Sequence, residues 1–401
     1  MNVLLVVGMA VILSFIGGKI VTRLKIPVIT GWVIMGIVFG GSVLGLFSES
    51  ILNRVDLISD IALGLIAFGI GRELLISNLR RLGKSIAAIV LCEALGAFFL
   101  VMISVFLLTH RLYEALVLAA VSSATAPAAT VMVLEETRSR GDLTTTILSV
   151  VALDDGIALI LYAFASSIAK VLLVHKGGLN FRTVLGNPGL EIFGALLLGG
   201  SIGLVLSLVA RRTRSRTDIF ALTMGAILVC IGLATRFHLS GLLANMALGI
   251  TLANLAPRSS RSIASIWEQA TPFLYMAFFC LAGAHLNIKL LPQIGLMGLV
   301  YTGARMLGKV SGASFGARVS HAPETVQKYI GFSLFPQVGV ALALAIVVKS
   351  DFINYGIAGR DLALVVINIL LFTTVITEIV GPYLTKWALI KSGEVGTRRT
   401  K

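Results

Sequence analysis

The stretch Ser149-Val-Val-Ala-Leu-Asp-Asp-Gly-Ile-Ala158 places two adjacent carboxylates, Asp154 and Asp155, inside an apolar run. The surrounding segment, 143–172, can cross a membrane as a helix, because the hydrocarbon core is about 30 Å thick and a helix rises about 1.5 Å per residue. An ionisable residue at the centre of a span costs about 2.5–3.5 kcal/mol even on a lenient scale. Neighbours on a helix point about 100° apart. We therefore expect one aspartate to hold a fixed partner while the other faces a cavity.

The rest of the chain has the same apolar character. Of its 401 residues 57% are hydrophobic and 13% charged, whereas a soluble domain has about 25% charged residues. The pattern predicts an all-α integral membrane protein with about thirteen transmembrane helices. The thirteen apolar segments are 3–22, 27–46, 56–74, 84–108, 114–134, 143–172, 188–210, 218–235, 239–256, 270–287, 292–317, 326–349 and 361–390.

The basic residues are distributed unevenly between the two sides of these spans. Of the 33 Lys and Arg residues, 22 fall on one side, 9 fall on the other, and Arg305 and Lys309 lie within a span. The positive-inside rule then predicts an outside amino terminus and a short cytoplasmic tail at 391–401. This topology also explains the net charge of +14 without a nucleic-acid partner. The three cysteines have no metal-ligand spacing, and we expect no cofactor.

Two stretches indicate an internal repeat. Phe68-Gly-Ile-Gly-Arg-Glu-Leu74 ends the third span, and Phe279-Cys-Leu-Ala-Gly-Ala-His-Leu286 ends the tenth. Aligning Gly71 with Gly283 gives an offset of 212 residues (283 − 71), or seven helices. Because seven is odd, the copies run in opposite directions through the membrane. We expect inverted repeats at about 1–172 and 218–390, a linker helix at 188–210, and one transmembrane unit over 1–390.

The same step pairs the central prolines of the fifth and twelfth spans, Pro127 and Pro336. A proline in a helix interior removes one hydrogen bond and clashes with the preceding turn, at about 3 kcal/mol. One such kink is common in membrane helices. Two at matching places in inverted halves indicate crossed broken helices around a transport site. Thr125 and Gln337 can supply oxygen atoms there.

Three further charged residues lie deep within spans: Glu93, Arg305 and Lys309. Arg305 and Lys309 are four residues apart and so share one helix face. Gly308, Gly312 and Gly316 form a small-residue ridge that permits close helix approach. The repeat offset places Glu93 opposite Arg305, which suggests a structural pair. Lys309 could keep one aspartate ionised or exchange its own proton.

Competition for one buried carboxylate is enough to make an antiporter. Burial penalises the charged form, so the group holds either a proton or a hard cation, and not both. A sodium-coupled organic-anion symporter would also cross two broken helices, but it needs no double aspartate with an intramembrane lysine. A cation channel or membrane sensor on the same scaffold is a further alternative. The sequence has no nucleophile elbow, phosphate loop or histidine metal motif to favour an enzyme.

With Ala124-Thr-Ala-Pro127 before the two aspartates and Arg305-x-x-x-Lys309 after them, the chain resembles the cation:proton antiporter superfamily. Within it, the chain is similar over residues 1–390 to bacterial sodium/proton antiporters with a double-aspartate motif and thirteen helices. The resemblance implies that Asp155 binds the transported monovalent cation and the proton, and that Asp154 pairs with Lys309.

The resemblance also implies the organisation of the protein. Thr125 and Gln337 would flank the site on the two broken helices. A dimerisation domain and a mobile core domain would form a homodimer in the cell inner membrane. Sodium, with lithium or potassium as alternatives, would be exchanged for protons, in support of pH homeostasis.

Two positions distinguish branches of this family. Electroneutral relatives have Asn in place of Asp154 and often Thr-Asp-Pro where this chain has Ala126, so the chain resembles the electrogenic branch. The family often has Leu-Asp at the ends of the third and tenth spans, where this chain has Leu74-Leu75 and Leu286-Asn287. We expect this departure to affect regulation or helix capping more than exchange.

Overall fold

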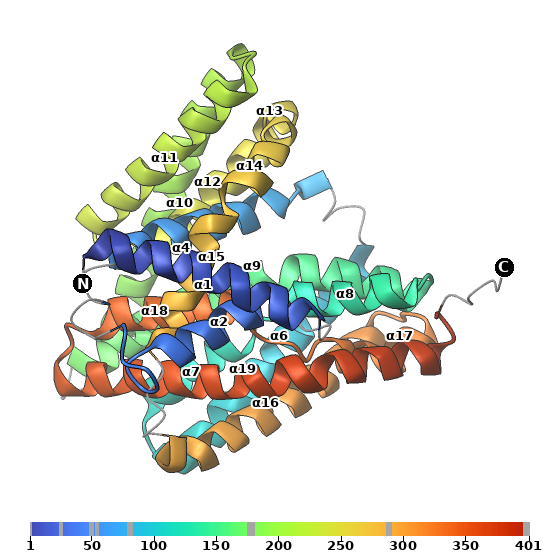
Figure 1. Cartoon of the computed structure of the whole chain (residues 1–401). Coiled ribbons are helices and arrows are strands. Elements are labelled where there is room, and N and C mark those ends of the chain that lie inside the picture. The colour runs from blue at the N-terminus through green and yellow to red at the C-terminus, as the bar shows by residue number, and fades with distance from the viewer. Residues whose placement is uncertain are drawn as a thin grey trace.

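The computed structural model describes residues 2–23, 27–47, 52, 56–77, 83–174, 181–285 and 291–395. Over these residues the chain is helical, apart from turns and an isolated bridge between Gly40 and Phe47 (Figure 1). The longer helices are α1 (Val3–Arg23), α2 (Val28–Phe39), α4 (Asp56–Glu73), α6 (Gly83–Thr109), α7 (Leu112–Ser122), α8 (Pro127–Thr137), α9 (Asp142–Val174), α10 (Phe181–Arg212), α11 (Arg216–Arg236), α12 (Gly241–Leu255), α15 (Pro272–Ala284), α16 (Leu291–Val319), α18 (Gly339–Phe352) and α19 (Gly356–Ser392).

Each predicted apolar segment coincides with one or more of these helices. Six described helices are long and apolar enough to cross a membrane, namely α1, α6, α9, the 189–212 part of α10, α11 and α19. Four shorter apolar helices, α2, α7, α12 and α15, accompany them. Two short helices that the sequence did not predict, α13 (Pro257–Ser262) and α14 (Ala264–Ala270), occupy the segment expected to be a loop. Pro257 begins α13, where its missing N–H has no helical partner to lose.

The two proline-containing segments are broken, as predicted. The first is interrupted between α7 and α8, and Pro127 begins α8. Ala126, just before it, has extended backbone angles (φ −91°, ψ 107°), because the proline ring disfavours a helical residue in front of it. The second segment comprises α17 (Glu324–Tyr329), the 3₁₀ turn η2 (Ile330–Ser333) and α18. The N–H of Ala126 donates to the carbonyl of Pro336 at 2.8 Å, so the two breaks meet.

Close glycine contacts reveal the inverted repeat. A Cβ on Gly71 of α4 would lie 2.0 Å from the carbonyl oxygen of Met246 in α12. In the other half, a Cβ on Gly283 of α15 would lie 2.3 Å from the carbonyl oxygen of Val33 in α2. The pairs α4–α12 and α2–α15 therefore approach each other in equivalent ways. The offset of 212 that aligned Gly71 with Gly283 relates two equivalent helix crossings.

Helices α6 and α16 pack together along the predicted glycine ridge. Gly96 and Gly308 face each other, since a Cβ on either would lie within 2.6 Å of the other's carbonyl oxygen. Gly312 similarly meets Cys92, and Gly316 meets Ala88. Residue numbers rise on α16 as they fall on α6, so the two helices are antiparallel. Gly96 and Gly308 also differ by 212 (308 − 96), which places them on the axis that relates the two repeats.

The helices pack in two groups. The broken-helix group contains α6, α7, α8, α9, α16, α17, α18 and α19, and the flanking group contains α1, α2, α4, α10, α11, α12 and α15. In Figure 1, α10, α11 and α12 lie on one side of the molecule, while α16 and α19 lie on the other. The deep charged residues belong mainly to the broken-helix group.

Candidate functional site

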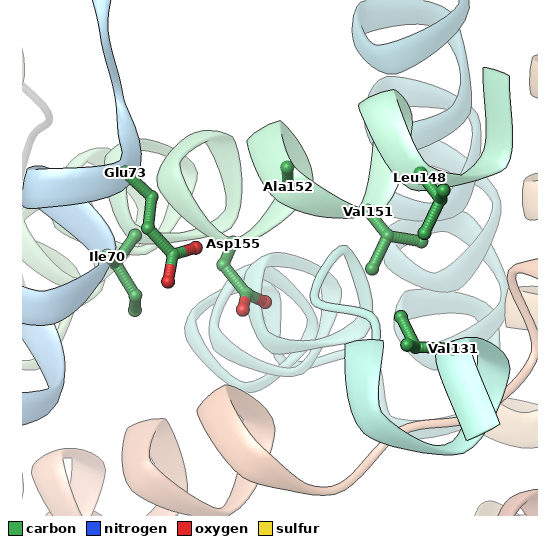
Figure 2. Close-up of a pocket in the computed structure, with 7 residues that line it drawn as sticks. All are labelled: Ile70, Glu73, Val131, Leu148, Val151, Ala152 and Asp155. Atoms are coloured by element: carbon green, nitrogen blue, oxygen red, sulfur yellow. The ribbon is translucent and has the colours of Figure 1, made fainter. Parts of the chain in front are cut away.

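The two adjacent aspartates of α9 point in different directions, as expected. Asp154 is fully buried and faces the break between α7 and α8. Asp155 is 8% exposed and lines a cavity of about 200 Å³ (Figure 2). Neither an ion pair nor a hydrogen bond connects Asp155 to another described side chain, and its Oδ1 is buried without a partner. The sequence could not decide which aspartate faces the cavity without the family resemblance.

Lys309 binds Asp154 at the first break. Its Nζ lies 3.1 Å from Asp154 Oδ2, 2.7 Å from Thr125 Oγ1 and 2.5 Å from the carbonyl oxygen of Ser123. The Thr125 hydroxyl also donates to Asp154 Oδ2. Asp154, Thr125 and Lys309 are thus in mutual contact, and the Asp154–Lys309 contact is the one that the family resemblance implied. Their hydrogen bonds supply partners for backbone and side-chain groups that lipid could not satisfy.

Glu93 contacts Lys309 and not Arg305, so the suggested structural pair is wrong. Glu93 Oε2 lies 2.6 Å from Lys309 Nζ, and both side chains are fully buried. The reason is geometric. Residues related by the repeat touch only if they lie on its axis, as Gly96 and Gly308 do. Because α6 and α16 are antiparallel, Glu93 lies beside the turn that follows Gly308, whereas Arg305 precedes it.

Arg305 instead connects the two broken segments. Its guanidinium donates to the carbonyl oxygens of Ser122 at 2.9 Å and Ala124 at 2.8 Å. It also donates to the carbonyl of Phe335 at 2.7 Å. A proline break frees carbonyl groups that must find partners within the protein. The fully buried Arg305 side chain supplies hydrogen-bond donors for such carbonyl groups at both breaks.

Gln337 supports the crossing from the second break. Its Nε2 donates to the carbonyl of Val121 and to Tyr301 Oη, both at 3.0 Å. The hydroxyl of Thr374 on α19 donates to the carbonyl of Gln337 at 3.0 Å. Gly381 lies against the ring of Pro336, where a Cβ would approach Cγ to 2.6 Å. Through these contacts Pro336 and Gln337 touch α7, α16 and α19.

The cavity beside Asp155 contains a second carboxylate that sequence reasoning missed. Glu73, at the end of α4, lines it together with Ile70, Val131, Leu148, Val151 and Ala152. Figure 2 shows the carboxyl groups of Glu73 and Asp155 turned toward the same space. A glutamate at a helix end is ordinary and by itself indicates no site. It does belong to the Phe68–Leu74 repeat motif, and that was the available signal.

Two other positions need separate mention. Glu378 of α19 is 1% exposed and accepts a hydrogen bond from Thr30 of α2 at 3.2 Å. It lies within the predicted span 361–390 and is a further deep charge beyond the five identified from the sequence. Of the family departures, Leu74 packs on Gly156, where a Cβ would lie 2.9 Å from it. Leu286 and Asn287 lie outside the described residues.

Comparison with known proteins identifies the family and the fold. The chain belongs to the sodium/hydrogen exchanger family, whose transmembrane model matches residues 10–390. The resemblance noted from the motifs is thereby confirmed. A comparison with curated proteins found no match.

Solved structures show the same fold. The sodium proton antiporter MjNhaP1 from Methanocaldococcus jannaschii at pH 8 is 18% identical, with a TM-score of 0.80 over 98% of this chain and 99% of that one. A second structure of that antiporter, from an electron-microscopy map, is 19% identical, with a TM-score of 0.75 over 98% of each chain. At such low identity, the likeness establishes the helical fold.

Proposed function

We propose that this chain exchanges sodium ions for protons across a membrane, and that Asp155 holds the two alternately. The observation that carries this proposal is the difference between the buried carboxylates. Asp154 and Glu93 share Lys309 as an ion-pair partner. Asp155 has no such partner among the described residues and lines a cavity. An unpaired carboxylate in a low-dielectric site is stabilised by whichever cation or proton reaches it.

The cation would be bound by oxygen atoms around this cavity. Asp155 and Glu73 line it directly. Asp154, next to Asp155 in the chain, and its hydrogen-bond partner Thr125 are further candidate ligands that the family resemblance implies. Carboxylate and hydroxyl oxygens suit hard monovalent cations, so lithium and potassium are alternative cargo. When a carboxylate oxygen of Asp154 binds the cation, Lys309 keeps Glu93 as a counter-ion. The lysine charge is then never left without a partner, which would be costly in a buried position.

Exchange requires the site to face each side of the membrane in turn. We assign the moving part to the broken-helix group, because Asp155, Asp154 and Lys309 all lie in it. The flanking group would be the stationary part and form a homodimer. We place the protein in the cell inner membrane, with the amino terminus outside and residues 391–401 in the cytoplasm. The uneven distribution of Lys and Arg supports this orientation.

A vesicle assay tests this function. Purified protein is reconstituted into liposomes that contain a pH-sensitive dye, and chloride salts of sodium, lithium and potassium are added in turn. We expect sodium to drive proton movement, and Asp155→Asn to abolish it because an amide cannot bind a proton and a cation alternately. Asp218→Asn, an exposed change on α11, is the matched control and should exchange normally. Normal exchange by Asp155→Asn would exclude this site, and sodium current without proton movement would indicate a channel.

A further inference from the structure

One face of α9 changes from exposed to buried at Asp155. On the amino-terminal side of Asp155, Leu148 is 44% exposed, Ala152 is also exposed, and both line the cavity. On the carboxyl-terminal side, Leu159 is 4% and Tyr162 2% exposed. Helix periodicity places these residues on one face, since Tyr162 follows Asp155 by seven residues, close to two turns. The site is therefore accessible from the amino-terminal end of α9 and closed toward its carboxyl-terminal end.

A cluster of polar side chains lies on the closed side. The hydroxyl of Tyr162 donates to Asp351 Oδ2 of α18 at 2.9 Å. Lys170 Nζ lies 3.4 Å from Asp351 Oδ1 and 3.4 Å from Glu191 Oε1 of α10. Ser167 donates to Glu191 Oε2 at 2.7 Å. Tyr162 lies about 10 Å beyond Asp155 along the helix, and Lys170 about 22 Å beyond it.

The contacts of this cluster divide between the two helix groups. Tyr162, Lys170 and Asp351 belong to the broken-helix group, whereas Glu191 belongs to the flanking group. The side chains of Lys170 and Glu191 are only 18% and 19% exposed. At that burial an ion pair is screened less by water than a surface pair. The contacts of Glu191 therefore connect the flanking group to the broken-helix group, which carries Asp155.

We propose that Tyr162, Lys170, Glu191 and Asp351 form a gate that closes the second route to Asp155. The inference rests on the proposed exchange function and adds the residues that control access. In the closed state Lys170 bridges Glu191 and Asp351. For the site to open toward the carboxyl-terminal end of α9, Lys170 and Ser167 must leave Glu191. The Lys170–Asp351 and Tyr162–Asp351 contacts persist, because all three residues belong to the broken-helix group and move together.

This asymmetry gives a cross-linking experiment with an internal control. In a background with Cys92→Ala, Cys230→Ala and Cys280→Ala, one protein carries Lys170→Cys and Glu191→Cys, and the other carries Lys170→Cys and Asp351→Cys. Both are treated with a short, reducible bis-thiosulfonate linker, and loss of maleimide labelling verifies linkage. We expect the 170–191 link to stop sodium/proton exchange and a reductant to restore it. The 170–351 link should leave exchange at the level that the same protein shows before linkage, because both positions lie in the broken-helix group.

A labelling experiment tests the gate without measuring transport. Leu159→Cys, in the same background, is exposed to a membrane-impermeant thiol reagent added on the side of the α9 carboxyl terminus. We expect faster labelling when Glu191→Gln is present. Glu136→Gln is the matched control. Glu136 also forms an ion pair, with Oε1 3.5 Å from Lys386 Nζ, but this pair is not part of the cluster. Glu136→Gln should leave the labelling rate unchanged.

Three results would overturn the gate: exchange by the 170–191-linked protein, equal loss of exchange with both links, or no faster labelling with Glu191→Gln. These outcomes differ from failure of the proposed function. If the parent protein does not exchange sodium for protons in its unlinked form, the function is wrong, while the labelling rate still reports whether Glu191 controls access to Leu159.

Discussion

Lys309 and Asp154 are in direct contact, with 3.1 Å between Nζ and Oδ2, although 155 residues separate them in the chain. Asp154 lies on α9 of the first repeat and Lys309 on α16 of the second. Both side chains are fully buried, and Glu93 is a second anionic neighbour of the same ammonium group. This contact joins the two halves of the molecule at the place where their broken helices cross.

The first prediction is strong energetic coupling between Asp154 and Lys309. Removing one partner of a buried pair costs about 3–5 kcal/mol where the remaining charge is uncompensated, as for Asp154 after Lys309→Gln. Asp154→Asn should cost less, because Lys309 keeps Glu93 as a partner. A double-mutant cycle on thermal unfolding, with Asp154→Asn and Lys309→Gln, should show that the second change costs much less after the first. The exposed pair Glu324–Lys328 is the control and should show no comparable coupling. Additive effects at the buried pair would mean that the contact contributes little.

The second prediction concerns Arg305. Arg305→Gln removes hydrogen bonds to three backbone carbonyls, and each bond to a charged group is worth about 1.5–3 kcal/mol. We expect a lower melting temperature in detergent and loss of exchange. Arg305→Lys should not restore either, since an ammonium cannot match the fork of a guanidinium. Arg318→Gln, at the exposed end of α16, is the control. An unchanged melting temperature for Arg305→Gln would contradict the connecting role.

Glu73 provides the third prediction. It lines the cavity with Asp155, so Glu73→Gln should weaken cation binding more than it slows turnover at saturating sodium. We expect the half-saturating sodium concentration to rise about tenfold, which corresponds to about 1.4 kcal/mol. Initial rates over a sodium series measure it, with the exposed change Glu268→Gln on α14 as control. An equal half-saturating sodium concentration in wild type and Glu73→Gln would mean that Glu73 does not contribute to cation binding.

The fourth prediction is that exchange is electrogenic, with more than one proton per cation. Asp155 releases one proton, and the Glu93–Asp154–Lys309 cluster is a second titratable group beside it. In such a coupled cluster the proton belongs to the group and not to one residue. A membrane potential would then contribute about 2.3 kcal/mol per net charge per 100 mV. Reversal of exchange is measured in liposomes clamped with potassium and valinomycin. A reversal point that does not move with voltage would mean that this cluster releases no proton and that one proton is exchanged per cation.

Much of the fold could be predicted because its signals are local. Apolar length marks each span, and a proline breaks the helix in which it stands, whatever surrounds it. The inverted repeat was also visible, through Gly71 and Gly283, because both copies need a residue without a side chain at the same helix crossing. The ridge of Gly308, Gly312 and Gly316 was recognised for the same reason.

Pairing between distant residues was predicted less well. The sequence alone determined that this is a polytopic helical membrane protein with deep charges, because burial of charge in an apolar run is visible residue by residue. Only the tertiary structure decided that Glu93 contacts Lys309, that Arg305 holds backbone carbonyls, and that Glu73 faces Asp155. These contacts depend on the antiparallel packing of α6 on α16 and on the position of α4 beside α9. A side chain's partner is set by the helices brought next to it, and spacing along the chain does not specify which helices those are.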